Sequence, residues 1–214
     1  MHKMDNKSNY SDDLKVIKKM MEESSRFLSL SGLSGIFAGL AAIAGGVAAH
    51  FIILKTESSI IDSTLISLSV QESGKMVSLL IVDALVVLLL ALGGGLYFSH
   101  RKSEKKGLRV WTPVSKRLVV NLFLPLIAGG FFVFLLLIAN QWLLIVPAML
   151  IFYGLALVNA GKFTYDEIFY LGITEIITGF LAGIFQGSPL FFWTFGFGVL
   201  HVGYGLFMYR KYER

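Results

Sequence analysis

The chain of 214 residues contains no cysteine. It therefore holds no disulfide scaffold, no cysteine-ligated zinc, no cysteine nucleophile and no lipid anchor on a cysteine. Charge is also scarce, because only 15% of the residues are Asp, Glu, Lys or Arg, whereas a soluble domain carries about 25%. Hydrophobic residues make up 55% of the chain. This composition predicts a protein that is surrounded largely by lipid.

The common catalytic and phosphate-binding motifs are missing as well. The sequence contains no HExxH, GxSxG or Walker pattern. The glycine run at residues 93–95 follows no strand, so it is not a dinucleotide-binding fingerprint. The histidines lack the spacing of metal ligands. We therefore predict no catalytic residue, no metal site and no cofactor.

Six apolar stretches are long enough to cross a bilayer, which takes roughly 20 helical residues. We therefore expect an all-α bundle of six transmembrane helices within residues 31–210, with no separate soluble domain. Residues 1–30 precede the bundle, and residues 211–214 form a tail. The six predicted spans cover about residues 33–54, 76–98, 118–139, 142–158, 168–185 and 189–209.

The positive charges are divided unequally between the two ends of this bundle. Lys55 and Lys75 lie between spans one and two, and the other seventeen of the nineteen Lys and Arg residues fall on the opposite side. Because positive segments resist translocation, we expect a multi-pass protein of the cell membrane with both termini in the cytoplasm. The segment at 55–75 is too short to span, and we expect it to pack on the outer end of the bundle or in the membrane interface.

The segments that we expect on the cytoplasmic side are basic. Residues 11–28 place apolar side chains on one stripe, which predicts an amphipathic helix on the inner membrane surface; docking on the bundle or on a partner is the alternative. The loop at 99–116 is basic too, but it carries no nucleic-acid recognition fold, so we expect no nucleic-acid partner. The expected partners are anionic lipid headgroups. The contacts would come from Lys15, Lys18, Lys19, Arg101, Lys102, Lys105, Lys106 and Arg109.

Four ionisable residues fall inside the spans: His50, Asp83, Glu175 and His201. Each costs about 2.5–3.5 kcal/mol at a helix centre, so each needs a partner. Counting residues from the span edges places Glu175 and His201 at one level near the middle of the membrane. His50 and Asp83 lie nearer the outer edge, where we expect a second pair.

We expect Glu175 and His201 to meet in the bundle interior, with Tyr170 or Tyr204 adding a hydrogen bond. A carboxyl group and an imidazole in contact can exchange a proton near neutral pH. A purely structural pairing of two helices is the alternative interpretation.

Glycines accompany both residues at helical spacing, and small residues let helices approach closely. We expect these glycine faces to bring spans five and six together, and similar faces could also hold a homo-oligomer. The glycines lie at 172, 179 and 183 in span five, at 198 and 205 in span six, and at 32, 35, 39 and 46 in span one.

The acidic residues ahead of span five have a structural explanation. Thr164 followed by Glu167 predicts a capping box, in which the two side chains bind free amides at the helix start. We therefore do not include the acidic pair, Asp166 and Glu167, in the candidate site.

Three function classes follow from these observations. The absence of motifs favours a small non-enzymatic membrane protein with a sensory, regulatory or scaffolding role. The alternative is a proton-linked carrier or channel for a small solute that uses Glu175 and His201. The third is an intramembrane enzyme acting on a lipid-like substrate, for which the sequence supplies neither a nucleophile nor a metal set.

Overall fold

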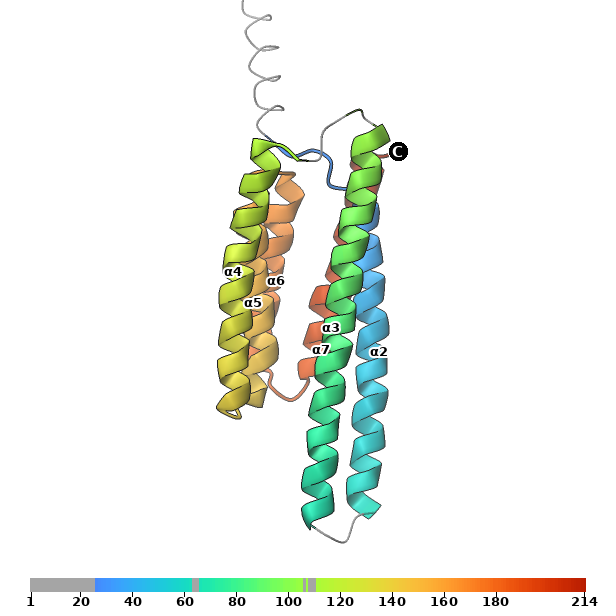
Figure 1. Ribbon diagram of the computed structural model, residues 1–214, viewed down its shortest axis with the longest axis vertical. Helices are drawn as coiled ribbons and strands as arrows, with labels where there is room; N and C mark the ends of the chain where they lie inside the picture. Colours follow the sequence, from blue (N-terminus) through green and yellow to red (C-terminus); the bar gives the residue numbers. More distant parts are fainter. Residues whose placement is uncertain (1–25, 63–65, 106, 108–110) are drawn as a thin grey trace, which may run out of the picture.

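The computed structural model describes residues 26–62, 66–105, 107 and 111–214, and this part of the chain is helical without a strand. Six helical stretches in it are long and apolar enough to cross a membrane, which confirms the predicted all-α six-span bundle. Figure 1 shows their arrangement. The elements are α2 (Gly32–Asp62), α3 (Ile66–Lys105), α4 (Pro113–Ile138), the 3₁₀ turn η1 (Trp142–Leu144), α5 (Ile145–Gly161), α6 (Asp166–Ile184), α7 (Pro189–Trp193), the π-helical segment η2 (Thr194–Leu200) and α8 (His201–Tyr212).

Local chemistry sets several of the helix ends. Thr112 caps α4 by accepting a hydrogen bond from the Ser115 amide, and Pro113 follows at the first helical position. Asn140 ends the connection after α4 with a positive φ of 56°, a conformation that asparagine tolerates better than most residues. The chain turns tightly there, so α5 returns antiparallel along α4.

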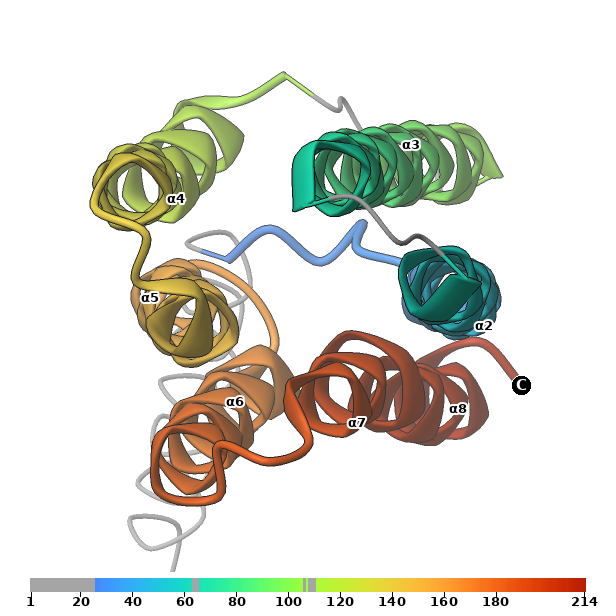
Figure 2. The same cartoon turned by 90° about the horizontal axis from the view of Figure 1, so that it is seen from below.

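The helices form two groups (Figure 1). We call α2, α3 and the continuous α7–η2–α8 stretch the α2 group, because α2 packs along both of the others. We call α4, α5 and α6 the α5 group, because α5 packs along both of its neighbours. The two groups touch mainly where the α7–η2–α8 stretch meets α5 and α6. Seen along the bundle, the helices form a ring (Figure 2).

Glycines let the helices of each group pack backbone against backbone. A Cβ atom added to Gly39 in α2 would lie 2.6 Å from the carbonyl oxygen of Gly198 in η2. A Cβ added to Gly172 in α6 would lie 2.7 Å from the carbonyl oxygen of Gly154 in α5. Such approach distances exclude any side chain. Glycines at these positions therefore allow α2 to pack closely on η2, and α6 to pack closely on α5.

These contacts correct the expected glycine pairing. The glycines of span five face α5 and those of span six face α2, so the two sets do not face each other. The glycines of span one also pack within the chain, because Gly32, Gly35, Gly39 and Gly46 are covered by η2 and α8.

The segment between spans one and two also differs from its prediction. Helix α2 continues to Asp62 and α3 begins at Ile66, so the described parts of this segment, residues 55–62 and 66–75, extend the two helices and do not fold back on the bundle. The two helices instead run beyond the ends of α4, α5 and α6 (Figure 1). A helix satisfies its backbone hydrogen bonds internally, so it needs no support from the rest of the bundle.

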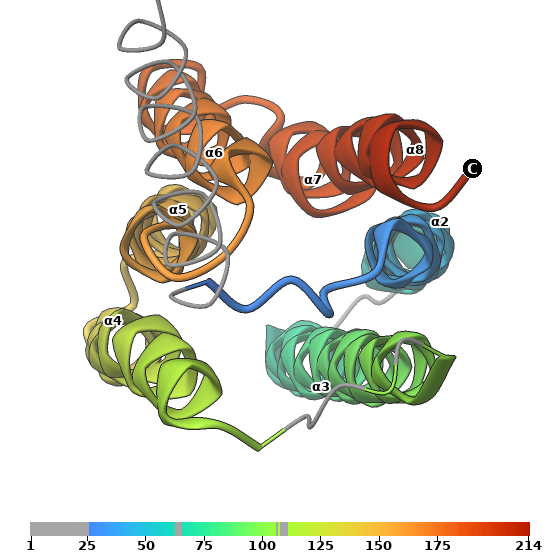
Figure 3. The ribbon, with the colours of Figure 1, turned by 90° about the horizontal axis from the view of Figure 1, so that it is seen from above.

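Residues 27–31 cross the other end of the bundle. We call this end, which also carries Glu213, the terminus end, and the opposite one the far end. Figure 3 shows residues 27–31, in blue, lying across the middle of the ring between the two groups. The chain then enters α2 at Gly32.

The substitution Gly172→Ala is expected to destabilise the bundle by about 1–3 kcal/mol, because the new methyl group would overlap the backbone of α5. Thermal unfolding in detergent measures the change. The control is Gly95→Ala in α3, where a Cβ meets nothing within 4 Å. Equal melting temperatures for the two variants would contradict the close packing of α5 on α6.

Candidate functional site

The candidate site is built around Glu175, which lies between the two groups of helices. The Glu175 side chain on α6 is fully buried, and its Oε1 lies 3.4 Å from Nδ1 of His201 at the start of α8. A Cβ added to Gly196 in η2 would lie 2.7 Å from Glu175 Oε2, so only glycine leaves room for this carboxyl group. The structure thus brings together two ionisable residues that lie 26 positions apart in the sequence.

Hydrogen bonds fix the orientation of the His201 ring. Its Nδ1 lies 3.1 Å from the carbonyl oxygen of Gly196, and its Nε2 lies 2.6 Å from the hydroxyl of Tyr153 on α5. A carbonyl oxygen can only accept, so Nδ1 carries a hydrogen. In the neutral ring Nε2 then accepts from Tyr153. A second proton on His201 would require the Tyr153 hydroxyl to turn and accept instead.

The carboxyl oxygens of Glu175 have no hydrogen-bond partner among the described residues. The contact with His201 is within ion-pair distance but is not a hydrogen bond, because the Nδ1 hydrogen points to Gly196. Burying an ionised carboxylate without donors is very costly. Glu175 is therefore suited to hold a proton or to face a cation, and each unsatisfied buried group of this kind calls for a functional explanation.

The π-helical geometry of η2 positions His201. The bond from its ring to Gly196 reaches back five residues, within the segment where the helix widens. Single π-helical turns inside α-helices are frequent at functional sites. In this chain the widened turn presents both the Gly196 backbone and the His201 ring to Glu175.

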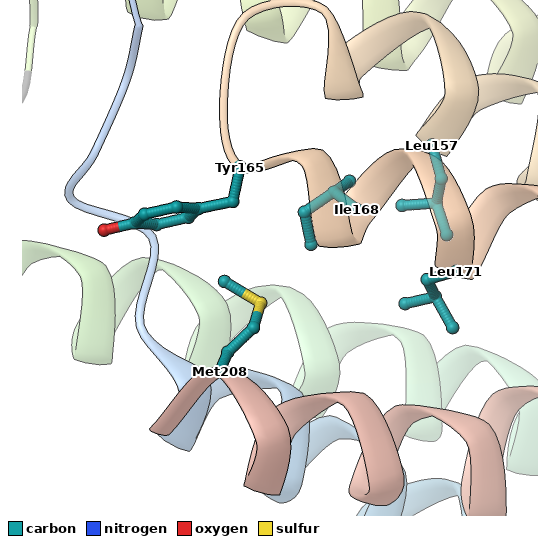
Figure 4. Close-up of a cluster of buried hydrophobic side chains, with 5 residues drawn as sticks. All are labelled: Leu157, Tyr165, Ile168, Leu171 and Met208. Carbon is teal, nitrogen blue, oxygen red and sulfur yellow. The ribbon is translucent and has the colours of Figure 1, made fainter. Parts of the chain in front are cut away.

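Apolar clusters lie on both sides of the site along the bundle axis. Toward the terminus end, five buried side chains from α5, α6, α8 and the α5–α6 connection pack together (Figure 4). Toward the far end, Ala42, Val87 and Trp193 form a second cluster, against which Phe197 packs. The site is therefore closed along the axis. The cluster in Figure 4 consists of Leu157, Tyr165, Ile168, Leu171 and Met208.

The two tyrosines expected beside Glu175 and His201 lie elsewhere. Tyr170 is 59% exposed on the outer surface of α6, and Tyr204 packs against the cluster of Figure 4. Tyr153 makes the hydrogen bond instead, so the expectation for Tyr170 and Tyr204 is wrong. The physical reason is that α5, and not α6 or α8, faces the open edge of the His201 ring. Tyr153 is the one tyrosine of predicted span four, a signal that could have singled it out.

The expected pair of His50 and Asp83 does not form. The Asp83 carboxyl lies opposite Gly45 on α2, where a Cβ would be 3.4 Å from Oδ2. His50 is exposed and its ring lies beside that of Phe51. Gly45 faces α3 at the level of Asp83, so His50 lies more than one helical turn farther along α2.

We expected Lys102 to contact lipid headgroups, but it is buried at the terminus end. It is 7% exposed, and its Nζ donates to the Leu30 carbonyl oxygen at 2.7 Å and to Glu213 Oε1 at 3.2 Å. Its ammonium group also lies 5.2 Å from the Tyr165 ring centroid. A buried ammonium group needs such partners. Helix α3 continues far enough to bring Lys102 within reach of Leu30 and Glu213.

The predicted capping box at Thr164 and Glu167 is absent. Thr164 donates its hydroxyl hydrogen to the Phe27 carbonyl oxygen at 2.7 Å, and Glu167 accepts from Lys211 at 2.6 Å and from Tyr212. The N-cap of α6 is Tyr165, which makes no side-chain cap bond. Both side chains thus bind neighbouring segments, which the local sequence pattern does not reveal.

The remaining headgroup candidates are only partly described. Arg101 and Lys105 are exposed near the end of α3, where they can reach a membrane surface. The other five lie outside the described residues, as does most of the expected amphipathic helix at 11–28. These five are Lys15, Lys18, Lys19, Lys106 and Arg109.

The described part of the chain holds no group of three or more His, Cys, Asp or Glu side chains that could bind a metal ion. Comparisons with protein-family models, curated proteins and solved structures find no match. The fold and the site define a multi-pass α-helical membrane protein with a buried carboxyl–imidazole–phenol constellation between two groups of helices.

Tyr153 and His201 are expected to couple in a double-mutant cycle. Tyr153→Phe and His201→Leu should each lower the melting temperature, with a coupling free energy of about 0.6–1.7 kcal/mol, the range for hydrogen bonds within membranes. Tyr170→Phe is the control, because that side chain faces outward. Additive effects of Tyr153→Phe and His201→Leu would argue against the hydrogen bond.

Proposed function

We propose that the protein is a proton-linked carrier for a small solute, with Glu175 as its proton-binding group. The observation that carries the proposal is the fully buried Glu175 carboxyl group, which lacks a hydrogen-bond donor and lies 3.4 Å from His201. An ionisable residue kept inside the membrane at such cost typically belongs to an ion or proton pathway.

The division into two groups of helices supports this proposal. Many carriers work by rocking one bundle against another around a site near the middle of the membrane. Glu175 and Tyr153 belong to the α5 group, whereas His201 and Gly196 belong to the α2 group. A relative movement of the groups would therefore change the surroundings of Glu175, and with them its tendency to hold a proton.

His201 and Tyr153 supply the route by which a proton reaches or leaves Glu175. Nδ1 of His201 lies 3.4 Å from Glu175, and Nε2 is bonded to Tyr153. Once the Tyr153 hydroxyl turns and leaves Nε2 free to accept a proton, the Nδ1 proton can leave the Gly196 carbonyl oxygen for Glu175. The apolar clusters on either side keep water away from the site, so that protons do not pass through water without solute movement. A carrier needs this isolation so that proton movement accompanies solute movement.

A sensory or regulatory protein is the second candidate. The dense contacts of residues 27–31 favour it, because they connect the segment after the basic N-terminal residues to both groups of helices. In this second proposal the buried site serves as a proton sensor. Proton-driven solute flux separates the two candidates.

We propose further that the terminus end faces the cytoplasm and contacts anionic headgroups. The seventeen-to-two distribution of Lys and Arg between the two ends supports this orientation. Exposed Arg101 and Lys105 on α3 lie at the terminus end, where such lipids would be met.

Proton-coupled flux is expected to depend on Glu175. Purified protein in liposomes that contain a pH-sensitive dye is challenged with panels of small sugars, amino acids and organic ions. At least one solute should drive a pH change that falls about tenfold or more in Glu175→Gln, because the variant cannot exchange a proton. Glu104→Gln, an exposed carboxylate on α3, is the control. Undiminished flux in Glu175→Gln would refute the assigned role.

The orientation can be read from single cysteines, since the chain has none of its own. Gly187→Cys at the far end should react with a membrane-impermeant thiol reagent added to whole cells, whereas Lys162→Cys at the terminus end should react only after lysis. Both positions are exposed. The reverse pattern would place the termini outside.

A further inference from the structure

Residues 27–31 bind both groups of helices at the terminus end, and we call them the strap. On the side of the α5 group, the Phe27 amide donates to the Phe163 carbonyl oxygen at 2.7 Å. Thr164 returns a hydrogen bond to the Phe27 carbonyl oxygen, and the Tyr165 hydroxyl donates to the Leu28 carbonyl oxygen at 2.7 Å. The strap is therefore fixed to the α5–α6 connection through its backbone.

Burial keeps the Tyr165 bond intact over the physiological range. Burial and the nearby Tyr212 and carboxylates raise the pKa of Tyr165 to about 12. The phenol therefore keeps its proton, and can donate to the Leu28 carbonyl oxygen, well above neutral pH. This attachment does not act as a pH switch.

On the side of the α2 group, Glu213 and Lys102 bind the strap, and we call these two residues the clasp. The Glu213 carboxylate accepts from the Ser31 hydroxyl at 3.0 Å and from the Gly32 amide at 2.6 Å. It also pairs with Lys102 at 3.2 Å, and Lys102 donates to the Leu30 carbonyl oxygen. Both clasp side chains are at least 87% buried, so their charges are poorly screened by water.

The strap also covers the apolar cluster that separates the terminus end from Glu175. Leu28 and Leu30 pack against this cluster, and Tyr165 belongs to it while binding the strap. Figure 4 shows Met208 of α8 facing Tyr165 from the opposite group. The strap continues into α2 at Gly32. The groups can therefore move apart at this end only if the strap loosens from Glu213 and Lys102 or from the α5–α6 connection, and if Glu167 on α6 also parts from Lys211 and Tyr212 on α8.

We propose that the strap locks the two groups together at the terminus end, and that the clasp controls access from that end to the Glu175 site. This inference rests on the proposed function only where it says that opening at this end gives access to the proton-binding Glu175. The lock itself follows from the contacts of Glu213, Lys102 and the α5–α6 connection.

Cysteine accessibility tests the lock without measuring transport. Two reporters are used in purified full-length protein: Ser29→Cys in the strap, which is 2% exposed, and Met208→Cys in the cluster beneath it, which is 3% exposed. Each is combined with Glu213→Ala, with Lys102→Met, or with the control Glu104→Ala. A small water-soluble thiol reagent then gives a labelling rate for every variant.

Both clasp variants should raise both labelling rates about tenfold or more, because each removes charge-assisted hydrogen bonds from the closed form. The control should leave the rates unchanged. Slow labelling of Ser29→Cys in both clasp variants would overturn the role of the clasp. Fast labelling of Ser29→Cys with unchanged labelling of Met208→Cys would overturn control of the site.

The two proposals fail in different experiments. The melting temperature of each variant is measured first, and only variants that unfold cooperatively near the wild-type temperature are compared. If the clasp variants expose Met208→Cys while no solute drives Glu175-dependent proton flux, the lock stands and the carrier proposal fails. If flux depends on Glu175 but labelling never changes, the lock fails and the carrier proposal stands.

Discussion

The contact of Glu175 with His201 joins the two groups of helices in the interior of the bundle, and the polar groups of the site are arranged around it. Lipid offers no hydrogen bonds, so every polar group inside the bundle depends on a partner from the protein. Glycine contacts hold each group together internally without polar atoms. The polar binding between groups is thus left to the His201 constellation in the interior and, at the terminus end, to the strap and to the contacts of Glu167 on α6 with Lys211 and Tyr212 on α8. The stability of the assembly and the chemistry of the site draw on the same few residues.

These two polar regions differ in how well their atoms are satisfied. At the terminus end, Glu213 has three donors, and Lys102 has the Leu30 carbonyl oxygen as well as Glu213. In the interior, Glu175 has none. A satisfied network rigidifies the parts that it joins, whereas an unsatisfied buried carboxyl group favours any rearrangement that brings it a proton or a cation. The structure therefore combines a well-satisfied polar network at the terminus end with an unsatisfied buried carboxyl group, Glu175, at its centre.

The fold was largely predictable, and the site was predictable in part. Apolar length defines the six spans, and counting residues along them places Glu175 and His201 at one depth. The helix neighbours were not accessible in this way, because a glycine face at Gly172 or Gly198 indicates close packing without naming the partner helix. Tyr153 was missed since its helix was not expected beside His201. The roles of Thr164 and Lys102 depend on residues 27–31 folding back over the bundle, and no local pattern encodes contacts over such sequence separations.

The widened turn of η2 sets the rotation of α8 about its axis relative to α7. A π-helical turn contains one more residue than an α-helical turn. If η2 took up ordinary α-helical geometry, α8 would rotate by roughly 100° relative to α7, the angle that one residue contributes. The His201 ring would then swing from the interface toward another face of the helix, and a different side chain would confront Glu175. The one extra residue in the helical repeat is thus what directs the His201 ring toward Glu175.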